Sequence, residues 1–217
     1  MISSLFSNPE IFIYSVIALL LSIAVHEFAH AWSADYLGDP TARLQGRLTL
    51  NPLKHIDLYG GLFLLFFGFG WGKAVPFDPY NLKNPRKDAA IISFAGPLSN
   101  FILAIASALL LKLFILLHLS FLLVIGYNFL TIVIMINVML GVFNLLPINP
   151  LDGFKIVGGI LPEEKAHQWY ELERYGMIFL LLMIFPFGSG SMLDLIIHPI
   201  ISFITQLLIP NITGGII

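Results

Sequence analysis

Residues 11–34, IFIYSVIALLLSIAVHEFAHAWSA, decide the fold of this chain. A helix needs about 20 mostly apolar residues to cross the hydrocarbon core of a bilayer, and this stretch is long enough. Its last third nevertheless carries His26, Glu27 and His30. Ionisable side chains are energetically expensive inside a membrane and are functional by default there. The stretch therefore predicts a membrane-spanning helix with a functional polar end.

The residues His26-Glu27-Phe28-Ala29-His30 form an H-E-x-x-H motif. On a helix, side chains four positions apart share a face, so both imidazoles can bind one metal ion. Glu27 lies one position further round and can act on water at the metal instead of binding the metal. The alternative is a polar helix end close to the lipid headgroups. Because the motif lies within an apolar run, we favour a catalytic site with one zinc ion per chain, although these ligand types also suit other divalent ions.

The composition agrees with a membrane protein. Of the 217 residues, 58% are hydrophobic and 11% are charged, against about 45–50% and about 25% in soluble domains. Too few charged side chains remain to cover a water-facing surface, which excludes a soluble enzyme, a nucleic-acid-binding protein and a disordered chain. The chain has no cysteine, so any metal must be held by His, Asp or Glu. We expect one membrane domain over residues 1–217, with a catalytic core at about 11–153 and C-terminal helices at 163–209.

Four further apolar stretches follow the first. Residues 89–117 and 121–146 are each long enough to span a bilayer. Residues 175–187 and 192–209 lie near the C-terminus and are separated by a turn rich in Gly and Ser; the first of them is short. We therefore predict an all-α polytopic membrane protein with four transmembrane helices, or five if residues 175–187 cross completely.

The segment between the first two spans, residues 35–88, has a different composition. It is rich in Gly, Pro and Asn and holds seven of the eleven Lys and Arg residues. Because basic loops stay in the cytoplasm, we place this segment and the adjoining H-E-x-x-H motif toward the cytoplasmic side. Within it, residues 62–67 form a short apolar run that follows Gly60 and Gly61. The run is too short to span, and it predicts a membrane-associated β-hairpin or loop.

A catalytic zinc site needs a third protein ligand, and Asp152 is the best-placed candidate. It lies in NLLPINPLDG, residues 144–153, directly after the third span. That span returns to the cytoplasm in the predicted topology, so Asp152 reaches the side on which His26 and His30 lie. One alternative is that Asp152 only forms a turn before the following glycine. His55, in the cytoplasmic segment, is the rival ligand.

The two motifs together resemble those of the site-2 protease family of intramembrane zinc metalloproteases, in its compact prokaryotic branch without a PDZ domain. The resemblance covers about residues 24–153. It implies that His26, His30 and Asp152 bind zinc and that Glu27 is the catalytic base. Further segments similar to the family are residues 38–43 (GDPTAR), 46–52 (GRLTLNP), 70–76 (GWGKAVP) and 96–100 (GPLSN).

Two asparagines are further candidate site residues. Asn144 lies at the predicted inner end of the third span, where a neutral amide can donate to a peptide carbonyl or to a developing oxyanion. The alternative is a hydrogen bond between helices, which is common for membrane asparagines. Asn100 follows Gly96 and Pro97, and it fits either the same role or close helix packing. Both are candidate substrate-binding or oxyanion residues.

The motifs and the resemblance together predict a zinc metalloendopeptidase that hydrolyses peptide bonds in or near transmembrane segments of other membrane proteins. The expected partners are a substrate with a transmembrane helix and the lipid bilayer, with no nucleic acid. We expect a multi-pass protein of a prokaryotic cell membrane, with its active site toward the cytoplasm. The competing class is a non-catalytic membrane protein or divalent-metal carrier that uses the same His and Asp groups. These motifs specify neither the substrate nor the oligomeric state.

Overall fold

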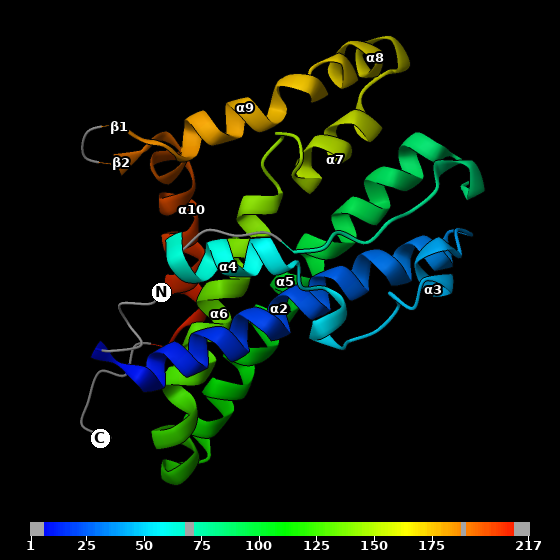
Figure 1. Ribbon diagram of the computed structural model, residues 1–217. Helices are drawn as coiled ribbons and strands as arrows, with labels where there is room; N and C mark the ends of the chain where they lie inside the picture. Colours follow the sequence, from blue (N-terminus) through cyan, green and yellow to red (C-terminus); the bar gives the residue numbers. More distant parts are fainter. Residues whose placement is uncertain (1–6, 68–71, 188–189, 211–217) are drawn as a thin grey trace.

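Three long helices form the centre of the protein (Figure 1). The computed structural model describes residues 7–67, 72–187 and 190–210. Within these ranges, the helices long and apolar enough to cross a membrane are α2 (Pro9–Tyr36), α5 (Pro85–Leu116) and, over Gly126–Asn144, α6 (Ser120–Asn144). Helices α2 and α5 each have a proline in the first turn, where its fixed φ suits a helix and its missing N–H costs no hydrogen bond.

Helices α2, α5 and α6 pack against one another as a bundle. Small side chains let α5 approach α6: Ala104 and Ala108 are buried in one cluster with Ile134 and Val138. Lipid removes most of the hydrophobic driving force between helices, so close packing of this kind holds them together. Leu109 and other large apolar side chains of α5 point outward and are exposed, as expected for a surface that faces lipid.

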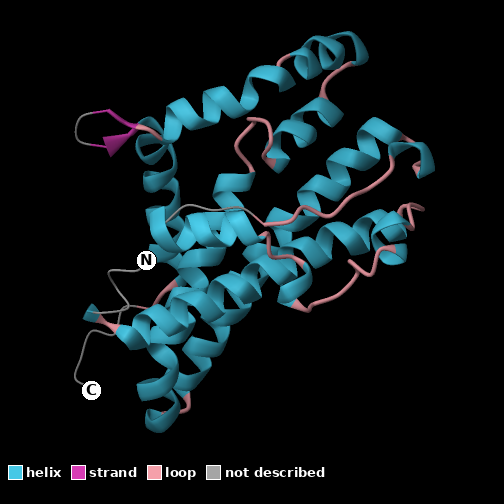
Figure 2. Ribbon diagram, viewed as in Figure 1, coloured by secondary structure: helices cyan, strands magenta, loops and turns pink. Residues whose placement is uncertain are grey.

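The C-terminal part adds shorter elements to this bundle (Figure 2). They are α7 (Asp152–Ile160), α8 (Glu163–Glu171), α9 (Glu173–Ile184), the paired strands β1 (Pro186–Phe187) and β2 (Gly190–Ser191), and α10 (Met192–Leu208). Helix α7 packs on α5, and Arg86 Nη1 donates a 2.9 Å hydrogen bond to the Leu161 carbonyl just after α7. Helix α10 packs on α6. The first residue of α7 is thereby held against the bundle.

The connection from α2 to α5 is mostly irregular. It contains α3 (Thr41–Leu44), the 3₁₀ turns η1 (Pro52–Lys54) and η2 (Pro79–Asn81), and helix α4 (Leu58–Phe67). Side chains cap the two 3₁₀ turns: Asn51 accepts the N–H of Leu53, and Asp78 accepts the N–H of Tyr80. Each of these turns begins with a proline, Pro52 or Pro79, directly after its capping residue.

The predicted β-hairpin or loop at residues 62–67 is wrong, because these residues belong to α4. Asp57 Oδ1 accepts the N–H of Gly60 at 2.8 Å and caps this helix, so the two glycines lie inside its first turn. The run LYGGLFLLFF contains no β-branched residue, and a helix satisfies its own backbone groups in apolar surroundings. In the described part of this connection, strand-like pairing is limited to one bridge between Ile56 and Gly72.

The two apolar helices near the C-terminus are shorter than the three long helices of the bundle. Helix α9 has 12 residues and α10 has 17. At 1.5 Å per residue, α9 is about 18 Å long, short of the hydrocarbon core of about 30 Å. It ends at Ile184 because Pro186 disfavours a helical conformation in the residue before it. The described residues therefore show three long candidate spans and the shorter apolar helix α10, where four or five spans were predicted.

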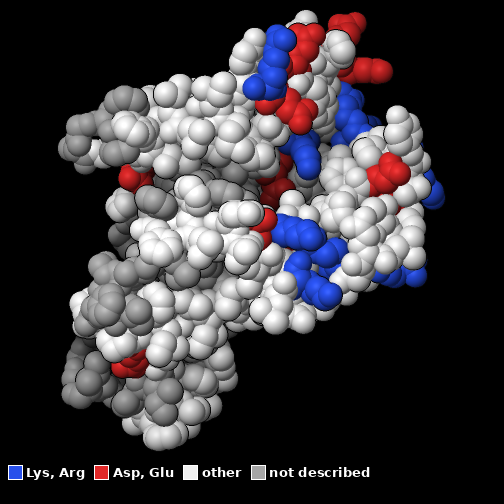
Figure 3. Space-filling view, viewed as in Figure 1, with Lys and Arg blue, Asp and Glu red and all other residues white. Residues whose placement is uncertain are grey.

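Charged side chains are unevenly distributed over the face shown in Figure 3. Lys and Arg gather at one end of the molecule, over α3, α8 and the start of α5. Much of the remaining surface in this view is uncharged. This uncharged surface is the part that a bilayer can cover, with the basic end in water.

Candidate metal centre

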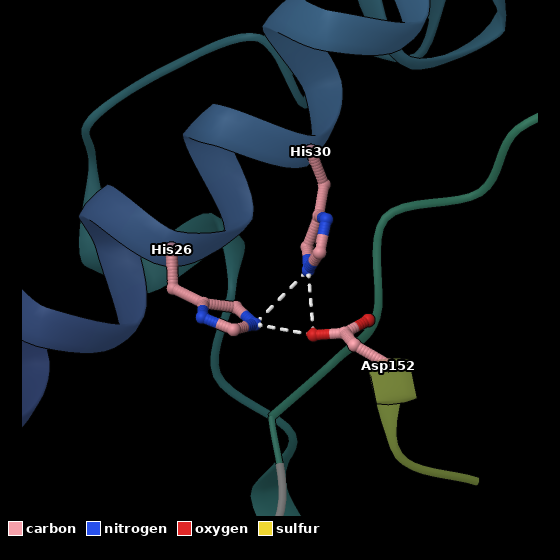
Figure 4. A group of neighbouring side chains, drawn as sticks. All are labelled: His26, His30 and Asp152. Atoms are coloured by element: carbon pink, nitrogen blue, oxygen red, sulfur yellow. Dashed lines mark hydrogen bonds and ion pairs between the residues drawn. The ribbon is translucent and has the colours of Figure 1, made fainter. Parts of the chain in front are cut away.

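Three side chains from two elements converge on one point (Figure 4). His26 and His30 project from α2, and Asp152 is the first residue of α7. His26 Nε2 lies 3.0 Å from His30 Nε2, and Asp152 Oδ2 lies 3.2 Å from the first nitrogen and 3.3 Å from the second. Ligand atoms about 2.1 Å from one zinc ion at tetrahedral angles are about 3.4 Å apart. The observed triangle therefore fits a single zinc ion.

The chemistry of these atoms also fits a cation. His26 and His30 are buried, and Asp152 Oδ2 is a buried oxygen that finds no hydrogen-bond donor in the described residues. A buried carboxylate oxygen without a donor is energetically unfavourable, and a bound metal ion removes that penalty. Two imidazoles and one carboxylate are the donor set of a three-ligand catalytic zinc site, which leaves the fourth position open.

Hydrogen bonds on the far side of each imidazole orient the two rings. His30 Nδ1 lies 2.7 Å from the Ile92 carbonyl oxygen, which can only accept, so Nδ1–H donates. His26 Nδ1 lies 2.6 Å from Asn100 Oδ1 and donates to it in the same way. The Nε2 lone pair of each ring then points to the shared site. Such outer contacts fix the tautomer of metal-binding histidines.

Asn100 belongs to a buried polar network that joins the three long helices. Its Nδ2 donates to Asn137 Oδ1 of α6 (2.8 Å) and to the Ser22 carbonyl of α2 (3.3 Å). Asn137 Nδ2 donates in turn to Ser22 Oγ at 2.7 Å. All three residues are fully buried. The structure therefore places Asn100 behind His26 as its support, with no part of the amide exposed to a substrate.

Helix α5 also approaches the metal centre through a glycine. A Cβ added at Gly96 would lie 2.4 Å from His30 Nε2 and 2.7 Å from His26 Cε1. The Nδ1 atom of each ring is held by a hydrogen bond, so a ring that moved away would lose that bond. A side chain at position 96 would clash with the two imidazoles, and glycine leaves room for them. The GPLSN segment therefore borders the metal centre directly.

A tight turn presents Asp152. The chain leaves α6 after Asn144 and folds back, with Ile148 N–H donating to the Leu146 carbonyl at 2.8 Å. A Cβ at Gly153 would lie 2.3 Å from the Leu145 carbonyl oxygen, so the turn closes only over a glycine. Asn144 is half-buried at the end of α6, and its Nδ2 donates to the Leu140 carbonyl at 3.0 Å. Its substrate-binding role stays a prediction.

Glu27 is half-buried and stands outside the three-ligand cluster. Its Oε2 accepts a 2.9 Å hydrogen bond from the backbone N–H of Val75. Oε2 is thus held by the protein backbone, and Oε1 takes no part in this bond. The role of Glu27 as catalytic base stays a prediction.

His55 does not join the cluster among the described side chains. It is fully buried, and its Nε2 donates to the Thr49 carbonyl at 2.8 Å. Of the two candidate third ligands, the structure therefore brings Asp152 to the histidines. Gly70 and Trp71, part of the GWGKAVP segment, lie outside the described residues.

Sequence analysis did not identify the roles of Ser22 and Asn137 in this site. A usable signal existed for each of them. Ser22 lies one helical turn before His26 and therefore on the same face of α2. Asn137 interrupts an otherwise apolar span, where a polar side chain needs a partner.

The chain is similar to known proteins over most of its length. The profile of Peptidase family M50 matches residues 14–123 and 122–185. "Putative zinc metalloprotease YwhC" of Bacillus subtilis is 42% identical over 180 residues, which cover 81% of this chain and 82% of that protein. Rip2 of Mycolicibacterium smegmatis, which carries the same description, is 33% identical over 83% of this chain and 70% of its own length. "Zinc metalloprotease MJ0392" of Methanocaldococcus jannaschii is 27% identical over 76% of this chain and 39% of its own length. No solved structure matches the chain.

Proposed function

This chain belongs to peptidase family M50, and on that premise we propose that it is an intramembrane zinc endopeptidase. Its substrates are membrane proteins that it cleaves in or near a transmembrane segment. The observation that carries the proposal is the convergence of His26, His30 and Asp152 on one point, with Glu27 next to them in sequence but outside the cluster.

The ligand residues and Glu27 have separate tasks in this proposal. His26, His30 and Asp152 would hold one zinc ion, which supplies a Lewis acid for the attack of water on a peptide carbonyl. Glu27 takes a proton from the attacking water and delivers it to the leaving amide nitrogen. Its Oε2 is already bonded to Val75 N–H, so Oε1 is the atom available to take the proton.

The proposal places this site in the membrane, toward the cytoplasmic side. The histidines lie within α2, and the basic residues that follow α2 favour the cytoplasm. Helix α10 would add a fourth crossing, and α9 a fifth, partial one. Asn144, at the end of α6, would donate to a substrate carbonyl from the same side.

A substrate helix keeps its peptide bonds inside its own hydrogen bonds and must unwind before it is cleaved. Residues 72–75 offer a place for the unwound strand. Lys73 directs its backbone N–H and carbonyl to His55 and Arg47. Ala74, the next residue, is exposed, and we assign its backbone groups to pairing with a substrate strand.

The test compares the wild type with Glu27→Gln in lipid vesicles. The probe is a quenched fluorescent peptide with an apolar segment of about 20 residues interrupted by Gly and Pro. We expect cleavage by the wild type, a rate at least about a hundredfold lower for Glu27→Gln, and about one zinc per chain in both. Glu10→Gln changes an exposed carboxylate in the first turn of the same helix and should behave as the wild type.

The outcome also separates the proposal from a divalent-metal carrier. A carrier that uses Glu27 to bind its cargo would lose metal affinity in Glu27→Gln. Cleavage by Glu27→Gln at the wild-type rate would contradict the assignment of the base.

The assignment of the third ligand has its own measurement. Zinc content after dialysis should fall close to zero in Asp152→Ala, because that variant removes one of the three ligand atoms. It should stay at the wild-type level in His55→Ala, whose ring bonds Thr49 instead. Full zinc in Asp152→Ala would overturn the site.

A further inference from the structure

Residues 72–75 contact both helix α2 and a buried cluster around His55. Gly72 bridges Ile56, and Lys73 N–H donates to the His55 carbonyl at 2.8 Å. A Cβ added at Gly72 would lie 3.3 Å from the His55 carbonyl oxygen and 3.5 Å from the Ile23 side chain of α2. The segment therefore passes through a narrow space, and its position depends on what lies on either side.

A buried arginine also holds this segment. The Arg47 Nη2 atom donates to the Lys73 carbonyl and lies 3.5 Å from His55 Nδ1. His55, itself fully buried, is fixed by its bond to the Thr49 carbonyl. Arg47, His55 and the Lys73 backbone thus form one connected group.

Arg47 has an unusual environment for a charged residue. It is only 5% exposed, and its Nε has no hydrogen-bond partner in the described part of the chain. None of the ion pairs formed by the described residues includes it. A buried guanidinium without a carboxylate is destabilising. Its side chain donates to the Lys73 carbonyl, which points to a role in holding that backbone.

The same segment holds the carboxylate of Glu27. Lys73 N–H meets the His55 carbonyl, and two residues further on Val75 N–H meets Glu27 Oε2 at 2.9 Å. The orientation of Glu27 therefore depends on where the Lys73 backbone is held.

We propose that Arg47 and His55 are positioning residues for the catalytic base. They fix the Lys73 backbone, and Val75 N–H then fixes Glu27 Oε2, so that Oε1 faces the reacting water. This inference rests on the proposed function of Glu27. It also gives a role to the GRLTLNP and GWGKAVP segments, which the metal site does not use.

The first experiment compares Arg47→Met with Arg43→Met, using the vesicle assay and the quenched peptide. Arg47→Met keeps an apolar stem but removes every donor. We expect its kcat to fall between about tenfold and about a hundredfold, with zinc content and KM close to those of the wild type. Arg43 is an exposed arginine paired with Asp35 at 2.8 Å, and Arg43→Met should leave all three quantities unchanged.

The second experiment removes only the hydrogen bond between Val75 N–H and Glu27. Val75→Pro deletes the N–H that Glu27 accepts, and Val75→Ala shortens the side chain but keeps that N–H. We expect a similar fall in kcat for Val75→Pro, rescue in Val75→Ala, and full zinc in both. This pair still tests the proposal if Arg47→Met fails to fold.

The results distinguish this inference from the proposed function. The positioning role would be overturned if Val75→Pro kept the kcat of the wild type. It would also be overturned if a fall in zinc content accounted for the whole loss of activity in Val75→Pro. If the wild type itself does not cleave the peptide while Glu27→Gln behaves identically, the proposed function fails instead.

Discussion

Two regions support the proposed catalytic centre, and they are built differently. The ligand histidines are supported from inside the helix bundle, by the side chain of Asn100 and a backbone carbonyl of α5. Glu27, on the same helix as the histidines, is supported by Val75 from the connection between α2 and α5; we call the described residues of this connection, 37–67 and 72–84, the loop layer. The candidate metal ligands thus depend on helix packing, and the proposed base depends on this connection.

This difference has physical consequences. Helix positions are fixed by many backbone hydrogen bonds and by close-packed faces, so ligand atoms on helices keep their separations. The loop layer depends on single bonds between side chains and backbone, such as that of Arg47 to Lys73. We expect changes in the bundle to alter metal binding, and changes in the loop layer to alter proton transfer or local stability while the metal stays bound.

The largest effect on the bundle is expected from Gly96→Ala. Its Cβ would lie 2.4 Å from His30 Nε2, and the ring is pinned by the Ile92 carbonyl. Zinc affinity should therefore fall by at least about a hundredfold, the upper range for loss of a supporting contact at a metal site. Equilibrium dialysis with zinc would measure the change.

Gly126→Ala is the matched control, since it places the same methyl group in a membrane helix. A Cβ at Gly126 would meet the Phe114 ring at 3.4 Å, an ordinary contact. Its zinc affinity should equal that of the wild type. Normal affinity in Gly96→Ala would show that α5 does not restrict the two imidazoles.

A smaller effect on the same region is expected from Asn137→Leu. The leucine keeps the branched skeleton but leaves Asn100 Nδ2 without its 2.8 Å acceptor, so Asn100 no longer holds His26 firmly. Zinc affinity should fall about tenfold, and excess zinc should restore activity. A titration of activity against free zinc would measure both.

Asn144→Leu tests the other asparagine of α6. Its amide bonds only its own helix among the contacts identified, at the Leu140 carbonyl, so zinc affinity should not change. Cleavage should fall at all zinc concentrations if Asn144 contacts the substrate as proposed. A loss of zinc in Asn144→Leu would place this residue in the support of the metal instead.

The parts of this protein that sequence analysis predicted are those with a local signal. The long apolar stretches predicted α2, α5 and α6, and the four-residue spacing of His26 and His30 predicted their common face. Asp152 was found because the distribution of Lys and Arg placed it on the side of the histidines. Each of these inferences uses residues within one element or a charge pattern along the chain.

The parts that sequence analysis did not predict depend on contacts between distant residues. A short apolar run does not distinguish strand from helix, so α4 was taken for a hairpin; the cap by Asp57 was the missed signal. Asn100 fitted both substrate binding and helix packing in the sequence, because nothing there shows that it bonds His26, 74 positions away. The Val75 bond to Glu27 involves a backbone group, which leaves no residue signature at all.

The smallest predicted effect concerns Asp39, which holds the loop layer together without touching the metal centre. Its fully buried carboxylate accepts hydrogen bonds from Thr41 Oγ1 (2.5 Å), Asn81 Nδ2 (2.8 Å) and Asp78 N–H (2.7 Å). Burial acts to raise the pKa of this carboxyl, but these bonds outweigh it and hold the pKa below its ordinary value. A lowered folded-state pKa means that the carboxylate stabilises the fold above its unfolded pKa, and that this contribution is lost as the pH falls below about 4.

Asp39→Asn should therefore lower the apparent Tm of the zinc-free protein at pH 7 by several degrees, in line with about 1–3 kcal/mol for hydrogen bonds to a charged group. The difference from the wild type should shrink as the pH is lowered toward about 3, because only the wild type loses a charge at this position. Asp35→Asn is the control: it removes an exposed ion pair with Arg43, worth about 0–1 kcal/mol, and should change Tm little. Zinc affinity at pH 7 should be normal in both variants, since the bundle alone holds the ligands. Loss of zinc in Asp39→Asn would show that the loop layer also supports the metal, and the two regions would then not be independent.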